Sequence, residues 1–161
     1  MEFKARVEGL DDLQRRFKQA PLMVERYMRR FMKRALPVLE GEVRKRTPVN
    51  TGRLRASITH DVQGLGAKMQ GVVGSAVKYA PAVEEGTDPH WPPYEAIEYW
   101  VRRKLRPPAS QLYVVTRGVQ QAIARAGTRG AHMFQEALEE SQARLGRMWS
   151  AIWGEAVEKE L

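Results

Sequence analysis

The sequence of 161 residues contains no cysteine. Disulfide bonds, thiolate metal sites and cysteine nucleophiles are therefore excluded, and the composition is compatible with assembly in a reducing cytoplasm. The sequence also lacks an apolar run near 18 residues, which excludes a membrane-spanning helix. Residues 1–7 lack the apolar segment of a signal peptide, so we do not expect secretion by that route.

Histidine is scarce as well. His60, His90 and His132 stand far apart in the sequence. None of them has a second histidine at the short spacing that metal ligands require, so we expect no metal site.

Residues typical of catalysis or cofactor binding are equally sparse. Gly64 and Gly66 are too short a pattern for a dinucleotide-binding fingerprint and lead from one strand to another. Glu84, Glu85 and Asp88 are candidates for acid–base chemistry, but adjacent acids in a polar loop are more often solvated. No matched base, nucleophile or oxyanion donor accompanies them. We therefore expect no catalytic residue, no cofactor and no enzyme activity.

What the sequence does have is positive charge concentrated near its start. The formal net charge is +8; residues 1–60 contain 15 Lys and Arg against 7 Asp and Glu, whereas residues 61–161 contain 12 of each kind. A localised basic surface attracts polyanions over about 8 Å at physiological salt. The simpler alternative is that these side chains solvate the outer face of an amphipathic helix.

The first elements are short. Alternation of apolar residues predicts a strand at residues 2–7. Asp11 or Asp12 is a suitable N-cap for a helix that runs to about Gln19, and Pro21 interrupts this helix or restarts it.

A long amphipathic helix is predicted from residue 21 to about residue 46, with a bend at Pro37. Its apolar residues recur with a helical period and form one stripe: Val24, Tyr27, Met28, Phe31, Ala35, Leu39 and Val43. Its other side is basic: Arg26, Arg29, Arg30 and Lys33.

Beyond Thr47-Pro48, which ends the long helix, a β-hairpin is predicted. Thr51 is a plausible cap for a short helical turn over residues 52–56. Strands then follow at residues 58–63 and 69–76, joined by a turn at residues 64–67. We expect the strand at residues 2–7 to be the third member of this sheet, and the long helix to cover one of its faces.

The second half is predicted to be mostly helical. Residues 86–93 are expected to form a loop, followed by helices over residues 96–105 and 112–126. A hinge at residues 127–130 then leads into a final helix from about residue 131. The expected fold is therefore α+β, with a small antiparallel sheet, a long helix and a helical C-terminal extension. We expect residues 1–161 to form one domain, with a strand–helix–hairpin core at 1–90 and the extension at 91–161.

Two of these helical faces are candidates for contacts with other molecules. Trp149 and Trp153, one turn apart on the final helix, either pack against their own domain or are buried against a neighbouring subunit. The basic helix over residues 26–34 either solvates the surface or contacts phosphates. Because no aromatic residue interleaves its basic face, any nucleic-acid contact should be non-specific and strongly salt-dependent. Its apolar stripe is more simply core than a membrane-binding face.

The strongest signal lies in two segments. Residues 47–58 read Thr-Pro-Val-Asn-Thr-Gly-Arg-Leu-Arg-Ala-Ser-Ile, and residues 79–87 read Tyr-Ala-Pro-Ala-Val-Glu-Glu-Gly-Thr. In this order they resemble the signature of a family of phage minor tail components, which lie at the neck of long-tailed bacteriophages. Residues 127–134 and the proline-rich stretch before Trp100 resemble one branch of this family. The motif residues that match are Thr47, Pro48, Thr51, Gly52, Leu54, Arg55, Ser57, Ile58, Tyr79, Ala80, Val83, Glu84, Gly86 and Thr87.

The resemblance implies a structural protein of the virion, present in the host cytoplasm during assembly. It implies a role in tail completion or head–tail joining, through a ring of copies that matches the sixfold tail. The implied partners are other copies of the chain, the phage connector and the tail-tube or terminator proteins. Packaged DNA would pass through the lumen, where the basic helix would make non-specific contacts. The alternative is a stand-alone, non-specific nucleic-acid-binding protein that uses residues 26–34.

Overall fold

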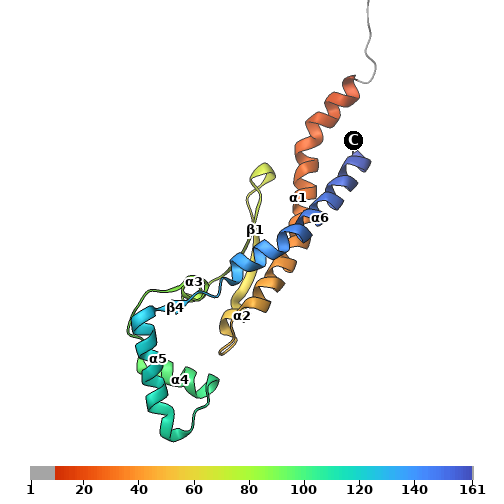
Figure 1. Cartoon of the computed structure of the whole chain (residues 1–161). Coiled ribbons are helices and arrows are strands. Elements are labelled where there is room, and N and C mark those ends of the chain that lie inside the picture. Colours follow the sequence, from red (N-terminus) through yellow and green to blue (C-terminus); the bar gives the residue numbers. More distant parts are fainter. Residues whose placement is uncertain (1–9, 161) are drawn as a thin grey trace, which may run out of the picture. The chain divides into compact units, whose positions relative to one another are not determined.

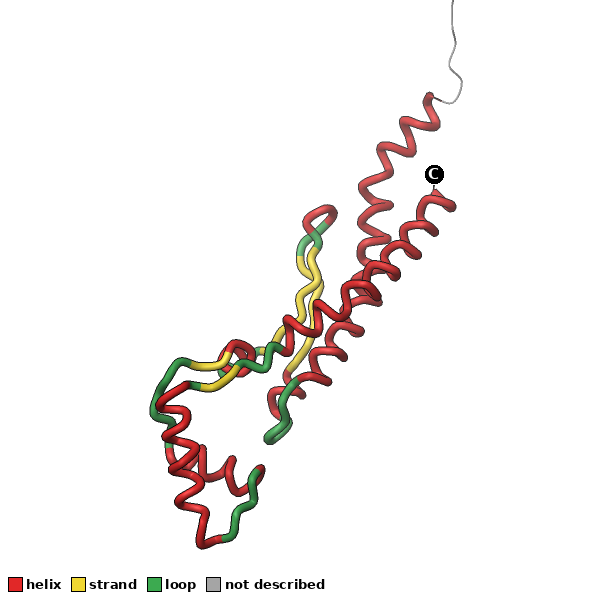
Figure 2. Tube along the Cα trace, in the orientation of Figure 1, coloured by secondary structure: helices red, strands yellow, loops and turns green. Residues whose placement is uncertain are grey.

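A computed structural model describes residues 10–160 of the protein (Figure 1). The strand expected at residues 2–7, and its place as a third strand of the sheet, lie outside the described residues. The fold is α+β, as predicted, with a long N-terminal helix that contacts a β-hairpin and a long C-terminal helix. Figure 2 shows how helices dominate the described chain.

The first helix, α1 (Leu10–Arg46), is continuous. The expected interruption at Pro21 is wrong, because a proline removes one backbone hydrogen bond and does not by itself end a helix. The helix also continues through Pro37, where the preceding residues Ala35 and Leu36 are both buried.

The elements after α1 are α2 (Arg53–Ser57), β1 (Ile58–Gln63), η1 (Gly66–Lys68), β2 (Gln70–Ser75), α3 (Ala80–Glu85), β3 (Gly86–Thr87), α4 (Tyr94–Lys104), η2 (Ala109–Gln111), α5 (Leu112–Ala126), β4 (Thr128–Arg129) and α6 (Met133–Glu160). The hairpin strands and the helices α2, α4, α5 and α6 follow the predicted order, whereas α3 is not among the predicted elements.

Two segments that the sequence predicts to be irregular contain short strands instead, so both predictions are wrong. Gly86 and Thr87 do not belong to a loop but form β3, and the expected hinge at residues 127–130 contains β4. The two strands pair antiparallel, with Gly86 opposite Arg129 and Thr87 opposite Thr128. Local sequence does not predict this ribbon, because its strands have two residues each and are separated by the whole α4–α5 segment.

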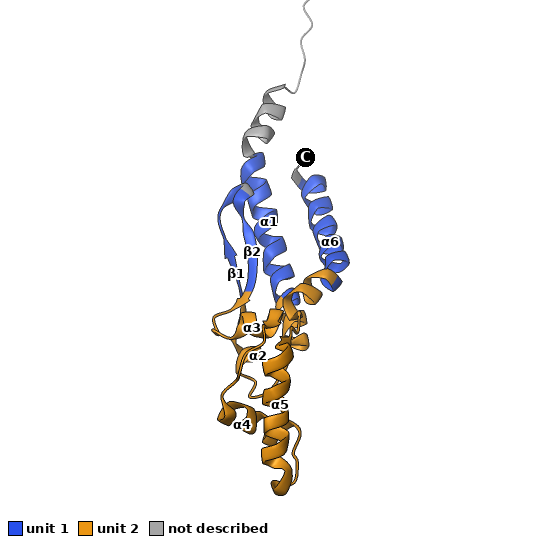
Figure 3. Cartoon of the chain, turned by 60° about the vertical axis from the view of Figure 1, so that its left-hand side comes forward, with its two compact units in different colours: residues 1–39, 60–73, 140–161 blue, residues 40–59, 74–139 orange. Residues whose placement is uncertain are grey.

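The described chain forms two compact units, each assembled from distant parts of the sequence (Figure 3). The first unit contains α1 up to Leu39, residues 60–73 of the hairpin, and α6 from Glu140 onward. The second contains residues 40–59 and 74–139. The expected single domain over residues 1–161, with a core at 1–90 and an extension at 91–161, stays a prediction.

In the first unit, α1 packs against both the hairpin and α6. At Gly71 of β2, an added Cβ would meet the side chains of Leu36 and Met32, which would have to shift to make room for it. On α6, Ile152 and Ala156 are buried together with Tyr27, and Met23, Phe31 and Trp153 pack around them. The apolar stripe predicted for α1 is therefore the face that builds this core.

In the second unit, α4 and α5 lie side by side as a helical pair (Figure 1). Val101 of α4 is fully buried, as are Thr116 and Gln120 of α5. The Gln120 side-chain amide donates to the carbonyl of Pro92 at 2.8 Å, which connects α5 to the segment before α4. The pair is inserted between β3 and β4, so it begins and ends at the same short ribbon.

Candidate functional site

The first motif begins where α1 ends. Thr47 is buried, and both its backbone N–H and its hydroxyl donate to the carbonyl of Val43, at 3.0 and 2.7 Å. The carbonyl of Thr47 accepts a hydrogen bond from the Arg55 guanidinium at 3.1 Å. The threonine therefore closes the last turn of α1, and Arg55 holds the following corner in place.

The turn that leads from Thr51 into α2 depends on Gly52. This residue has φ of 86° and is the N-cap of α2. A residue with a Cβ would be strained in this left-handed conformation. Thr51, the expected cap, contributes only a long contact of 3.4 Å in which its hydroxyl accepts the N–H of Arg53.

The end of the first motif is anchored by burial and by hydroxyl groups. Leu54 and Ile58 are buried, and Arg44 of α1 donates to the carbonyl of Ile58 at 2.7 Å. Ser57 lies 2.7 Å from the hydroxyl of Ser75, so the start of β1 and the end of β2 are tied together. These contacts connect α1, α2 and the hairpin within the second unit.

The second motif contacts the start of α6. The Glu84 carboxylate accepts hydrogen bonds from the backbone N–H groups of Phe134 at 3.1 Å and Gln135 at 3.1 Å. The carbonyl of Glu84 accepts the N–H of His132 at 3.0 Å, and the carbonyl of Val83 accepts that of Ala131 at 2.8 Å. Glu84 therefore accepts hydrogen bonds from the first N–H groups of α6 and caps this helix. Capping rules that consider only neighbouring residues in the sequence would not predict this role.

Glycines on both sides of the ribbon permit this contact. Gly86 has φ of 86°, and a Cβ there would collide with the carbonyl of Thr128. A Cβ on Gly130 would collide with the carbonyl of Glu84, and one on Gly127 with that of Thr87. The two segments that contain these glycines lie far apart in the sequence, and their backbones contact each other where glycine leaves room.

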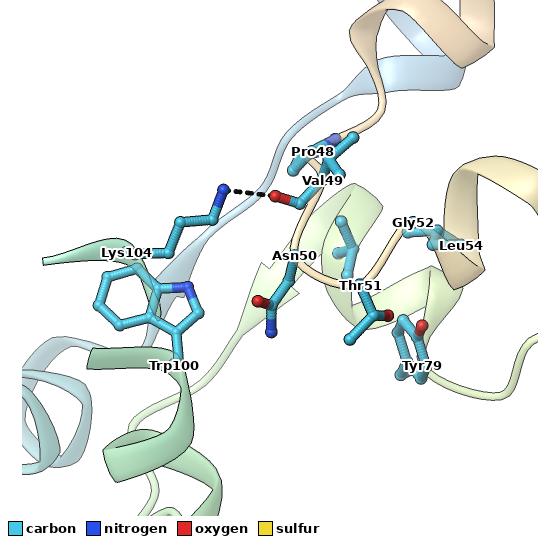
Figure 4. Close-up of a pocket in the computed structure, with 10 residues that line it drawn as sticks. Pro48, Val49, Asn50, Thr51, Gly52, Leu54, Tyr79, Trp100 and Lys104 are labelled. Atoms are coloured by element: carbon cyan, nitrogen blue, oxygen red, sulfur yellow. Dashed lines mark hydrogen bonds between the residues drawn. The ribbon is translucent and has the colours of Figure 1, made fainter. Parts of the chain in front are cut away.

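A cavity of about 390 Å³ lies beside the first motif (Figure 4). Its wall combines the motif loop with α4, whose Trp100 and Lys104 extend toward that loop, and Lys104 donates to the carbonyl of Val49. The lining residues are Pro48, Val49, Asn50, Thr51, Gly52, Leu54, Tyr79, Val83, Trp100 and Lys104.

The chemistry of this cavity suits a binding surface better than a reaction. Asn50 Oδ1 is buried without a hydrogen-bond partner among the described residues, so it can accept an N–H donor. Trp100 and Tyr79 supply partly exposed aromatic surface. The lining contains one cationic side chain and no carboxylate or histidine, and so offers no acid–base pair.

The basic residues of α1 surround a shallow hollow of about 430 Å³. Two of the predicted DNA-facing residues have anionic partners: Arg29 pairs with Glu25 at 3.0 Å and Arg30 with Glu155 at 2.8 Å. Arg26 lies over the Tyr27 ring, 5.3 Å from its centroid. The hollow is lined by five cations, one more than the sequence singled out: Arg26, Arg29, Arg30, Lys33 and Arg34.

The tryptophans of α6 contact α1 of the same chain. Trp149 meets Phe31 edge to face at 5.3 Å and stacks on Trp153 at 5.5 Å. Trp153 packs against the core formed by Tyr27, Ile152 and Ala156. Both indoles are half-buried in this packing; a subunit contact through them stays a prediction.

The remaining polar candidates lie apart. The ring Nδ1 of His90 lies 2.9 Å from the carbonyl of Asp88, which folds the loop before α4. Glu85 and Asp88 are exposed. Across residues 10–160, no group of three or more histidines or carboxylates is arranged to hold a metal ion. Within the same range, no helix has the length and apolarity needed to cross a membrane.

Sequence reasoning missed the residues that connect separate elements. Arg44, Lys104 and Gln120 each donate to a backbone carbonyl that is 14, 55 and 28 positions away, respectively. An arginine, lysine or glutamine in a helix carries no local signal of such a partner.

Comparison with known families identifies the segment that carries both motifs. Residues 11–86 match the family model described as "Bacteriophage HK97-gp10, putative tail-component". The match covers nearly all of α1, the first motif, the hairpin and the second motif up to Gly86. No curated protein and no solved structure gives a significant match. The resemblance expected from the motifs is thus confirmed over residues 11–86, which are similar to the HK97-gp10-like family of putative phage tail components.

Proposed function

We propose that the protein is a structural component of the virion neck or tail that acts in tail completion or head–tail joining. It would assemble as a ring of copies, six in number, around the DNA channel, in contact with the connector and the tail-tube or terminator proteins. The observation that carries the proposal is the family match over the segment that contains α1, the hairpin and both motifs.

The contacts of the motif residues support a building block rather than an enzyme. Thr47, Gly52, Glu84 and Gly86 all shape or cap backbone. Rigid corners of this kind present exposed faces in fixed directions, which is what a ring needs. In such a ring the contact is heterologous, so that one patch of each subunit meets a different patch of the next.

The experiment begins with purified virions. We expect mass spectrometry to find the protein in intact particles at about six copies per tail, and cryo-electron microscopy to place it at the neck or tail end. Its absence from purified virions would refute the proposal. A catalysed reaction of a small molecule in the cavity beside the first motif would also contradict it.

The cation-lined hollow of α1 favours a second candidate function, which is stand-alone binding of nucleic acid. Five cations around one hollow would hold phosphates without reading sequence. The ion pairs of Arg29 and Arg30 argue against nucleic-acid binding, because both cations already have carboxylate partners. Tight binding of duplex DNA by a monomer at physiological salt would favour this function over the ring.

A charge-matched comparison tests whether the basic helix faces packaged DNA in the ring. We would replace Arg26, Arg29 and Lys33 with glutamine and leave Arg30 in its pair with Glu155. The control replaces three exposed cations elsewhere: Arg125, Arg144 and Arg147. A lumen-facing helix predicts normal particle assembly and impaired DNA retention in the first variant alone. Loss of assembly in the first variant would place these residues in a protein interface instead.

A further inference from the structure

The end of α4 presents a basic patch around an exposed leucine. Residues 102–106 read Arg-Arg-Lys-Leu-Arg, and Leu105 is 51% exposed. Tyr99, one turn before Arg103, is also 51% exposed. We call Tyr99, Arg102, Arg103, Leu105 and Arg106 the basic patch.

Most of the charge in this patch is not neutralised within the chain. Arg102 pairs with Glu98. Arg103, in contrast, donates to the hydroxyl of Tyr99 at 3.3 Å, and Arg106 donates to the carbonyl of Arg103 at 3.4 Å. Among the described residues neither of these two arginines has a carboxylate partner. Two unpaired guanidinium groups therefore stand beside exposed apolar surface.

Arg106 has a left-handed backbone conformation just after the end of α4. Arg106 has φ of 50°, a conformation in which glycine is relaxed and other residues are strained. It follows the end of α4, and its N–H donates to the carbonyl of Val101 at 3.0 Å, as in a helix C-terminal motif that usually carries glycine. An arginine is present where glycine would satisfy the backbone better.

The first turns of α6 present the opposite charge. Glu136, Leu138 and Glu139 are exposed, Leu138 to 47%. Met133 and Ala137 are fully buried, so the exposed side of the helix carries Glu139, with Leu138 and Glu136 to either side of it. Glu136 has no cationic partner among the described residues, and Glu139 accepts only the side-chain amide of Gln135. We call these three residues the acidic patch.

We propose that the basic patch of one copy binds the acidic patch of a second copy. Guanidinium groups of Arg103 and Arg106 would meet the carboxylates of Glu136 and Glu139, and the two exposed leucines would be buried between them. The two patches differ, so the contact is heterologous and can be repeated from copy to copy. The inference rests on the proposed ring and names the surfaces that would build it.

A protein partner fits this patch better than nucleic acid. Phosphates would match the arginines but would leave Leu105 without an apolar contact. Tyrosine and arginine are enriched among the residues that contribute most of the binding energy of protein interfaces. A surface of complementary charge with its own exposed leucine is present on the same chain, which makes a second copy the partner of choice.

The absence of native cysteine makes a direct test possible. We would prepare full-length Leu105→Cys and Leu138→Cys chains of different mass, mix them under oxidising conditions, and count mixed dimers by mass spectrometry. The matched control mixes Leu105→Cys with Val114→Cys, an α5 position that is 69% exposed. We expect a severalfold higher yield for the first mixture at about 0.05 M salt, and loss of the excess at about 1 M salt. Equal yields in both mixtures would overturn the proposal.

Charge reversal tests which side chains form the contact. Arg103→Glu in the Leu105→Cys chain, or Glu139→Arg in the Leu138→Cys chain, should each lower the yield to that of the control. The two reversals together should restore it, because the pair regains opposite charges. If neither reversal changes the yield, or if Arg103→Glu instead abolishes binding of duplex DNA while cross-linking persists, the contact is not the one proposed.

These outcomes are separable from the proposed function. Presence of the protein in virions together with control-level cross-linking would leave the virion role in place and reject this interface. Specific cross-linking by a protein that is absent from virions would keep the interface and reject the virion role.

Discussion

Phe134 donates its backbone N–H to both carboxylate oxygens of Glu84, at 3.2 and 3.1 Å, across 50 positions of sequence. This contact connects the second motif, at residues 79–87, to the first turn of the C-terminal helix. The first N–H groups of a helix have no partner inside it, and a carboxylate there also interacts favourably with the helix dipole. The motif glutamate is thus engaged as a cap.

Replacing this acceptor should loosen the start of α6. We expect Glu84→Ala to lower the free energy of unfolding by about 1 kcal/mol, as for other lost helix caps. Glu85→Ala is the matched control: the neighbouring residue is exposed and should change stability by less than about 0.5 kcal/mol. Urea unfolding monitored by circular dichroism measures both. Equal effects would contradict the capping role.

The ribbon of β3 and β4 should not accept a side chain at Gly86. We expect Gly86→Ala to destabilise the fold by roughly 2–3 kcal/mol, because the residue has positive φ and its Cβ would collide with the backbone of Thr128. Gly118→Ala on α5 provides the comparison, since nothing lies within 4 Å of an added Cβ there. That change should instead stabilise the helix by about 1 kcal/mol. Thermal unfolding measures the stability of both variants. A change of stability of the same sign in both would refute the prediction.

Acid should weaken the contact between α1 and α6. Hydrogen bonds from Arg30 and Lys159 hold the pKa of Glu155 at about 2, below its ordinary value of 4.5. Because the folded pKa is the lower one, ionised Glu155 stabilises the fold at neutral pH, and this contribution is lost as the pH falls from about 5 toward 2. Glu155→Gln should flatten this part of the curve of Tm against pH.

The control for the acid dependence is Glu158→Gln, which removes an exposed carboxylate on the same helix. It should leave the dependence of the Tm on acid close to that of the unaltered protein. If both variants follow the unaltered curve, the pair of Arg30 and Glu155 does not contribute to stability in solution.

Packing within the chain assigns a stabilising role to Trp149. Its indole meets Phe31 and stacks on Trp153, but it is only half-buried. We therefore expect Trp149→Ala to lower the free energy of unfolding by about 2 kcal/mol, less than the roughly 3–5 kcal/mol of a fully buried aromatic. Trp91→Ala, at a 56% exposed position, should have little effect. Unchanged monomer stability with lost assembly would instead place Trp149 in a subunit contact.

The backbone strain at Arg106 should affect the free energy of unfolding, which can be measured separately from binding. We expect Arg106→Gly to raise the free energy of unfolding by up to about 1 kcal/mol, since glycine adopts the left-handed conformation without strain. Arg103→Gly, inside α4, should lower it by about 1 kcal/mol. Chemical denaturation of the two variants makes the comparison. A destabilised Arg106→Gly chain would show that the arginine stabilises its own fold.

Local patterns predicted the helices and the hairpin well. The apolar stripe through Tyr27, Ala35 and Val43 is the buried face of α1, and strands follow where alternation and the glycine-marked turn predict them. These elements are predictable because their hydrophobic period extends over many residues. In α1 the period continues past Pro21 and Pro37. The ribbon of β3 and β4 is too short to carry any such period.

Sequence patterns were thus sufficient to predict the α+β class, the helical faces, the glycine positions that a turn requires and the resemblance of residues 11–86 to a tail-component family. Three contacts became evident only from the folded chain: Gly86 meets Thr128, Glu84 caps α6, and Lys104 contacts the loop beside the cavity. The physical reason is that periodicity and turn chemistry act between neighbours in the chain. A donor and its acceptor 50 positions apart are brought together only when the intervening chain has folded.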